Sequence, residues 1–270
     1  MGFLISVSMS HITNTRNEEI QVSIFVITHK PYNKSPMKGY KTLQVGACKG
    51  HLQIGDVFDD TGENISEKNP QFCELTGLYW LSRNCNDNYI GTCHYRRFFS
   101  TDFFGKKPVN ERKVLRILNK KDMIVPFSRK LDVTVAEQYC RNSGYNKDLL
   151  IVRDIIAEKY PDYLVAYDNV FNGKITYFYN MLIAKEEVYK GYCDWLFNIL
   201  FEAEKRVDTT GYNDYQKRIF GFLSERLLSV WIHTNNIEVF EMGVINTEES
   251  PHIVRKLLSG LKRSLLSLGT

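Results

Sequence analysis

Side chains capable of chemistry are concentrated between Gly62 and Phe99. This stretch mixes polar and charged residues, which are costly to bury without a partner, with apolar residues typical of a core. A polar cluster inside a core-like segment indicates a site that recognises a polar, anionic group. The candidate binding residues of this segment are Asn64, Lys68, Asn69, His94, Tyr95, Arg96 and Arg97.

The strongest signal in the segment is the run His94-Tyr95-Arg96-Arg97, which follows a short apolar stretch with strand character. Guanidinium groups match the oxygens of a phosphate bidentately. We therefore expect Arg96 and Arg97, together with His94, to hold a diphosphate directly as cations. The alternative is that both arginines form structural ion pairs.

A divalent cation is the second means of stabilising a departing diphosphate. Sugar-nucleotide transferases often bind such an ion through an Asp-x-Asp motif after a strand, and this chain has no Asp-x-Asp in that context. The doublet Asp59-Asp60 lies in a turn-rich loop and could serve instead, with Asp60 as a ligand-binding candidate. We favour the cationic route, assign no metal ligands or required cofactor, and leave a role for Mn²⁺ or Mg²⁺ open.

Two carboxylates are candidates for a general base. Glu225 lies in the apolar helical pattern GFLSERLL beside Arg226, and Glu74 lies in the similar pattern CELTGLYW. An acid on an apolar helix can remove the proton of a sugar hydroxyl. It can equally be the internal partner of an arginine that joins two elements, and the residues alone do not separate these roles.

Strands and helices alternate along the chain, which is typical of an α/β layer architecture. The first strand, predicted over 21–28, ends abruptly at His29 and Lys30. Ligands of α/β folds lie beyond the carboxyl ends of strands, so we expect both residues at the ligand edge. The pattern also predicts a strand over 177–183 and helices over 72–84 and 215–234, with Asn69 as the cap of the first helix.

Composition excludes several functional classes. The 270 residues carry a net charge of +4, which is too mild for a nucleic-acid binder. The six cysteines form no CxxC pair, and no P-loop, GxGxxG, GxSxG or HExxH motif is present. Because the chain also shows no secretion signal and no apolar run long enough to span a bilayer, we expect a cytoplasmic protein.

Domain boundaries follow from composition. We expect a flexible leader over 1–20, a catalytic domain over 21–249, and a basic amphipathic helix over 250–270. The tail from His252 to Leu268 has one apolar stripe flanked by Arg255, Lys256, Lys262 and Arg263. Such a helix can rest on the inner, anionic face of the cell membrane or can dock on its own domain.

Several blocks, in this order, resemble a bacterial family of capsular and exopolysaccharide biosynthesis proteins. These are IFVITHKPY, GENISEKNPQFCELTGLYW, YIGTCHYRRFF, YNMLIAKEEVYKGYCDWLF and FGFLSERLLSVWI. The family, long catalogued as a domain of unknown function, is regarded as glycosyltransferases that include galactofuranosyltransferases. The resemblance implies a GT-A-like α/β domain, with a mixed central sheet flanked by helices and a helical C-terminal part. On this basis His29 lies near the nucleotide, and Asn180, Glu225 and Arg226 lie on the acceptor side.

These observations together predict a glycosyltransferase of the hexosyltransferase class. It would move galactofuranose or galactose from a UDP-sugar to a growing surface polysaccharide, with a lipid-linked glycan as the expected acceptor. Two alternatives remain: a non-catalytic protein that binds sugar nucleotides or glycans during assembly, and a transferase that moves a sugar phosphate.

Overall fold

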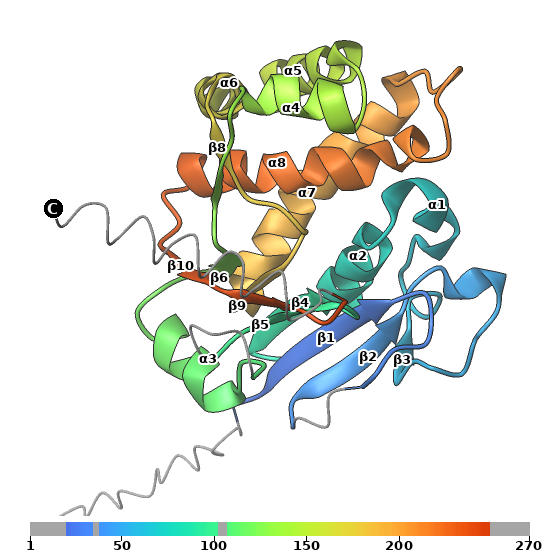
Figure 1. Ribbon diagram of the computed structural model, residues 1–270, viewed down its shortest axis with the longest axis vertical. Coiled ribbons are helices and arrows are strands. Elements are labelled where there is room, and N and C mark those ends of the chain that lie inside the picture. Colours follow the sequence, from blue (N-terminus) through green and yellow to red (C-terminus); the bar gives the residue numbers. More distant parts are fainter. Residues whose placement is uncertain (1–19, 35–37, 102–106, 249–270) are drawn as a thin grey trace, which may run out of the picture.

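The computed structural model describes residues 20–34, 38–101 and 107–248 (Figure 1). The predicted leader, except for its last residue, and the predicted amphipathic tail lie outside the described residues. Within the described ranges, no helix combines the length and hydropathy needed to cross a membrane.

The centre of the molecule is a nine-stranded sheet whose main path runs β10-β6-β9-β4-β1-β2-β3. All strands of this path run in the same direction except β9, which is antiparallel to both of its neighbours, β4 and β6. The short β5 and β11 pair with each other beside β4. The strands are β1 Val22–Thr28, β2 Tyr40–Gln44, β3 Val57–Phe58, β4 Tyr89–His94, β5 Arg97–Phe99, β6 Met123–Pro126, β9 Leu182–Lys185, β10 Val239–Met242 and β11 Val244–Asn246, with β7 Arg129–Lys130 and β8 Ile175–Thr176 forming a separate pair.

Strand β1 is buried along its whole length because both faces of the sheet are covered. Its side chains alternate between faces. Ile24 and Val26 share a hydrophobic cluster with Val114 of α3. Phe25 and Ile27 belong to the larger cluster on the other face. A strand with two buried faces is a near-continuous apolar run, which explains the sequence VSIFVIT.

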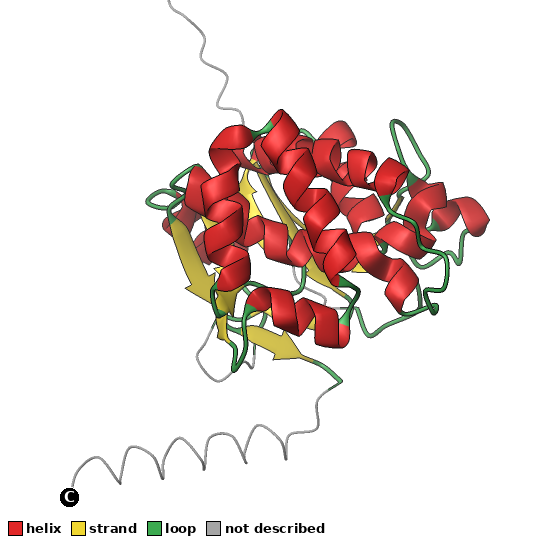
Figure 2. Ribbon diagram, turned by 90° about the horizontal axis from the view of Figure 1, so that it is seen from above, coloured by secondary structure: helices red, strands yellow, loops and turns green. Residues whose placement is uncertain are grey.

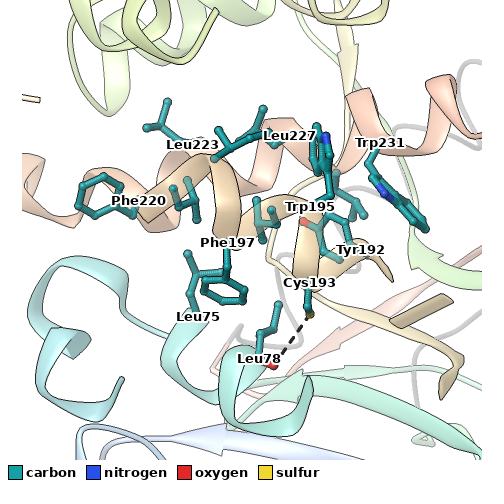
Figure 3. Close-up of a cluster of buried hydrophobic side chains, with 14 of the residues drawn as sticks. Leu75, Leu78, Tyr192, Cys193, Trp195, Phe197, Phe220, Leu223, Leu227 and Trp231 are labelled. Atoms are coloured by element: carbon teal, nitrogen blue, oxygen red, sulfur yellow. Dashed lines mark hydrogen bonds between the residues drawn. The ribbon is translucent and has the colours of Figure 1, made fainter. Parts of the chain in front are cut away.

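The larger cluster joins the sheet to a thick helical layer, which is seen from above in Figure 2. Figure 3 shows Leu75 of α2, Phe197 of α7 and Phe220 of α8 gathered in this core. Helix α3 covers the opposite face of the sheet (Figure 1). The helices are α1 Asn69–Phe72, α2 Leu75–Asn84, α3 Glu111–Leu118, α4 Val135–Asn142, α5 Asn146–Lys159, α6 Leu164–Asn172, α7 Glu186–Arg206 and α8 Ile219–Thr234, with 3₁₀ turns η1 Ala47–Lys49, η2 Ser66–Lys68, η3 Pro161–Tyr163 and η4 Gln216–Arg218.

The helix predicted over 72–84 is divided in two. Cys73 has a φ of 53°, in the left-handed region, and this residue separates α1 from α2. The predicted cap is also wrong, because Lys68 occupies the cap position and Asn69 is the first residue of α1. The Asn69 side chain instead donates to the carbonyl of Cys73 at 2.8 Å and so stabilises the break.

The strand predicted over 177–183 is wrong in its first part. β9 begins only at Leu182, and Tyr179 and Asn180 have φ values of 84° and 49°. The run YFYNMLI contains the aromatic and apolar residues of a strand, but hydrophobic pattern carries no information on the sign of φ. Residues 177–181 form an irregular connection instead, and its backbone contributes to the site described next.

Candidate functional site

Two cavities adjoin at the carboxyl-end edge of the sheet. The first, here called the strand-end cavity, has about 420 Å³ and lies beyond β1, β2 and β4, where Thr28, His29 and Tyr95 line it. The second, the interlayer cavity, has about 540 Å³ and lies between the sheet and α4 and α8. Both are lined by the same five residues, here called the shared wall: Cys73, Glu74, His94, Arg96 and Arg218.

Arg96 and Arg97 both reach these cavities. Arg96 lines both of them and forms an ion pair with Glu248 at 3.2 Å, with 39% of its side chain exposed. Arg97 lines the interlayer cavity with its guanidinium carbon 4.5 Å from the centre of the Tyr179 ring. The structural alternative therefore holds in part for Arg96, yet neither guanidinium is turned away into the core.

Arg218 is a cation that sequence reasoning did not assign to the site. It occupies the cap position of α8, and its Nε donates to the thiol sulfur of Cys73 at 3.1 Å. Burial raises the pKa of the Cys73 thiol to about 11, so this residue is a neutral part of the wall. The first turn of α8 contains no acid, although the positive end of a helix dipole favours one. The presence of Arg218, a cation, at the N-terminus of α8 was therefore the signal in the sequence that could have marked it as a site residue.

His94 does not carry the positive charge that we expected of it. Burial lowers its pKa, and Arg97 and Arg96 lower it further, so the imidazole is neutral near pH 7. Its Nε2 donates to the carbonyl oxygen of Tyr179 at 2.5 Å. His94 therefore joins the end of β4 to the irregular segment before β9. Partial burial and the nearby Lys30 likewise lower the pKa of His29, whose ring meets that of Tyr95 edge-on.

Glu74 lies in the shared wall, and a neutral partner orients it. The Asn180 amide donates to Glu74 Oε1 at 2.7 Å and to the carbonyl of Gly221 at 3.0 Å. The Asn180 oxygen accepts from the hydroxyl of Ser224 at 2.8 Å. Asn180 is only 3% exposed, so it acts as a support for Glu74. No hydrogen bond between described residues engages Glu74 Oε2.

Glu225 faces the interlayer cavity but is held at both oxygens. The backbone N–H of Tyr179 donates to Oε1 at 2.9 Å, and Arg226 Nη1 donates to Oε2 at 2.8 Å. Burial raises the pKa of Glu225, against the opposing effect of Arg226. Arg226 is 1% exposed and also donates to the Phe222 carbonyl and to Gln138. This buried pair joins α8 to α4 and to the Tyr179 segment.

Five predicted residues line neither cavity: Asn180, which is described above, and the four that follow. Lys68 forms an ion pair with Glu204 at 2.8 Å, and Asn64 is hydrogen bonded to its neighbours Gly62 and Ser66. Asp60 accepts from His51 at 2.8 Å, and Lys30 pairs with Glu248 at 3.8 Å. Of the predicted set, those that line the cavities are Glu74, Glu225, Arg226, His29, Asn69, His94, Tyr95, Arg96 and Arg97, and Asn180 supports Glu74.

The donor groups at this edge do not fit a divalent cation. The end of β4 presents arginines, whereas Mg²⁺ and similar ions require oxygen ligands. Asp59 is fully buried, and it accepts from the backbone of Gly46 and Ala47 and from the hydroxyl of Ser66. Across the described ranges, no three His, Cys, Asp or Glu side chains are grouped to hold a metal.

Other cavity residues were missed because their positions depend on tertiary structure. Tyr215 and Phe222 flank the guanidinium of Arg218, with ring centres 5.9 and 5.6 Å from its carbon. The sequence shows these rings as ordinary helix residues. The remaining lining residues of the interlayer cavity that were not predicted are Gln138, Asn142, Ser143, Phe178, Tyr179 and Gly221.

Comparison with known proteins identifies the family and the fold. A family described as "Domain of unknown function (DUF4422)" matches residues 23–236. Among solved structures, the chain is similar to the apo structure of WbbM, a bifunctional glycosyltransferase, with a TM-score of 0.76 and 27% identity. The match covers 85% of this chain and 46% of that one, so this chain spans about half the length of WbbM. No curated protein matches the chain. The predicted GT-A-like α/β fold with a mixed central sheet is confirmed.

Proposed function

The chain belongs to the DUF4422 family, and from this premise we propose that it is a glycosyltransferase. It would transfer galactofuranose or galactose from a UDP-sugar to a hydroxyl of a bacterial surface polysaccharide at the cytoplasmic face of the membrane. One observation carries the proposal. Two cavities meet at a wall that combines two arginines with an oriented carboxylate, which are the groups required to stabilise a leaving diphosphate and to activate a hydroxyl.

In this proposal the UDP portion occupies the strand-end cavity. Its position beyond the ends of β1 and β4 is where α/β folds bind nucleotides. Arg96 and Arg218 would neutralise the diphosphate as the bond to the sugar breaks, and neutral His94 would keep the wall in place. The same cations supply the charge that a metal ion would otherwise provide, so no step is assigned to a metal.

We assign the general base to Glu74. Its Oε1 is fixed by Asn180, and the residue lies where both cavities meet. Both oxygens of Glu225 accept hydrogen bonds, from Tyr179 and from Arg226. Protonation of Glu225 would leave the buried Arg226 without a counter-ion, which disfavours Glu225 as the base. Glu74 would take the proton of the acceptor hydroxyl while that oxygen attacks the anomeric carbon. The bond from this carbon to the diphosphate breaks, and its electron pair leaves with UDP.

Nucleotide chromatography tests the proposal. The purified protein is incubated with UDP-galactofuranose or UDP-galactose and a panel of octyl glycosides, and the released nucleotide is identified. Release of UDP that depends on the acceptor supports a glycosyltransferase. Release of UMP would instead indicate transfer of a sugar phosphate, and binding of UDP-sugar without turnover would indicate a non-catalytic binding protein.

A further inference from the structure

A third, smaller cavity continues the row formed by the first two. It has about 210 Å³, half the volume of the strand-end cavity, and lies at the end of β6, beside Val244 and Asn246 of β11. Arg97 and Tyr179 line both this edge cavity and the interlayer cavity. The three cavities therefore follow the order of the strands, from β2 and β1 through β4 and β9 to β6 and the segment after β10.

The edge cavity is strongly cationic. The guanidinium carbons of Arg97 and Arg129 lie 4.5 and 5.2 Å from the centre of the Tyr179 ring, and Arg129 also donates to the Tyr179 hydroxyl. No carboxylate is among the described residues that line this cavity, and no ion pair between described residues neutralises either guanidinium. Arg97 and Arg129 both lie against the Tyr179 ring in a cavity with no carboxylate among its described lining residues. This arrangement favours an anionic ligand.

An exposed aromatic ring completes the edge cavity. Phe127 directly follows β6, lines this cavity and is 55% exposed, so its ring is accessible to a ligand. An aromatic face beside cations is suited to the face of a sugar ring that carries a charged group. The proposed function assigns the nucleotide to the strand-end cavity at the other end of the row, so we expect the ligand of the edge cavity to be part of the acceptor.

We propose that the edge cavity is an acceptor subsite for an anionic group, a phosphate or a carboxylate, next to the sugar that is glycosylated. Arg129 and Arg97 would bind the anion, and Phe127 would contact the adjoining ring. The inference rests on the proposed function, because it takes the interlayer cavity as the place of transfer. It adds that the acceptor is charged, either through a lipid diphosphate or through an acidic sugar.

Ligand-observed NMR on protein saturated with UDP tests this subsite without knowledge of the natural acceptor. The probes are inorganic pyrophosphate, glucuronic acid and neutral galactose. We expect at least one anion to bind to UDP-loaded protein more tightly than galactose does. Arg129→Gln should weaken that binding about tenfold or more, while UDP affinity stays within twofold. Tighter binding of pyrophosphate identifies a diphosphate-linked acceptor, and tighter binding of glucuronic acid identifies an acidic glycan.

The matched control is Arg116→Gln, which removes the same charge from an exposed position on α3. It should leave binding of all three probes unchanged. The subsite is rejected if neither anion binds to UDP-loaded wild-type protein, or if Arg129→Gln binds them as well as wild type does. Titration of UDP into the same samples reports separately on the donor cavity, so failure of the subsite is distinguished from failure of the proposed function. Thermal melting monitored by circular dichroism shows whether Arg129→Gln is folded.

Discussion

The β3–η2 loop and the shared wall are both crowded with charge, but they use it differently. In the loop, over 59–68, Asp59 and Asp60 accept hydrogen bonds from nearby groups, and Lys68 forms an ion pair with a glutamate of α7. In the shared wall, Glu74 and Arg218 have neutral partners and face two cavities. Charge density in a sequence therefore does not identify a site by itself. What distinguishes Glu74 and Arg218 is that neutral partners hold them in place at the surface of two cavities, whereas Asp59 is fully buried and Asp60 and Lys68 lie outside both cavities.

The largest effect is expected from Glu74→Gln in the shared wall. Gln keeps the hydrogen bond from Asn180 within reach but cannot accept a proton, so kcat should fall about 100- to 10,000-fold. UDP affinity, measured by calorimetry, should change little. Asp60→Asn in the loop is the matched control and should retain the wild-type kcat. Equal activity of Glu74→Gln and wild type would remove Glu74 as the base.

The next effect is expected in the loop and concerns stability. Asp59→Asn directs an amide NH₂ toward donors that now bind carboxylate oxygens, in a fully buried position. The free energy of unfolding, measured with urea, should fall by about 2–3 kcal/mol. The folded fraction should bind UDP as wild type does. If Asp59→Asn is as stable as wild type but binds UDP more weakly, Asp59 belongs to the site, and the loop and the shared wall do not differ in function.

A smaller effect is expected for Arg96→Ala. Loss of one charge-assisted interaction with the diphosphate should weaken UDP binding about tenfold, equivalent to about 1.4 kcal/mol. Lys68→Met in the loop, which removes a cation that is paired with Glu204, should leave the UDP affinity within twofold. Calorimetry measures the UDP affinity of both variants. Equal losses of affinity in Arg96→Ala and Lys68→Met would show that UDP binding depends only on the net charge of the protein.

The smallest effect is a pH dependence of stability that comes from His94. Because burial lowers its folded-state pKa below 6.5, the unfolded chain binds its proton more readily. The resulting stability is present above pH 6.5 and is lost as pH falls through the lowered pKa. His94→Gln can still donate to the Tyr179 carbonyl but does not titrate. Between pH 7 and 5 its unfolding free energy should decline less steeply than that of wild type, by at most about 1.4 kcal/mol per pH unit. Parallel curves would mean that His94 does not govern this window.

The sequence allowed the edge of the sheet that carries the cavities to be located, because β1 and β4 are short apolar runs that end in polar residues. It did not allow Glu74 and Glu225 to be separated, since their partners Asn180 and Tyr179 are 106 and 46 residues away. Those two partners lie in a segment that was predicted as a strand. The local pattern shows which residues are apolar, but it does not show the positive φ values of Tyr179 and Asn180 or their hydrogen bonds to α8.

Lys68 and Asn64 were expected in the site, but they line neither cavity. Both belong to the polar cluster between Gly62 and Phe99, which we expected to form one site. The turn before α1 directs Lys68 to Glu204 on α7 instead. Arg218 lies 144 residues from Glu74 in the chain; the sequence shows a cation at the start of α8, but it does not show that this cation lies beside Glu74.

Glu248 lies at the end of the described chain, with one oxygen 3.2 Å from Arg96 and the other 3.8 Å from Lys30. The cation Arg96 of the shared wall thus has a counter-ion within the chain. Under the proposed function, a diphosphate that binds at Arg96 would displace Glu248, so its affinity would be a difference between two competing partners. A change in the segment that bears Glu248 would alter donor affinity without touching any group that contacts the donor.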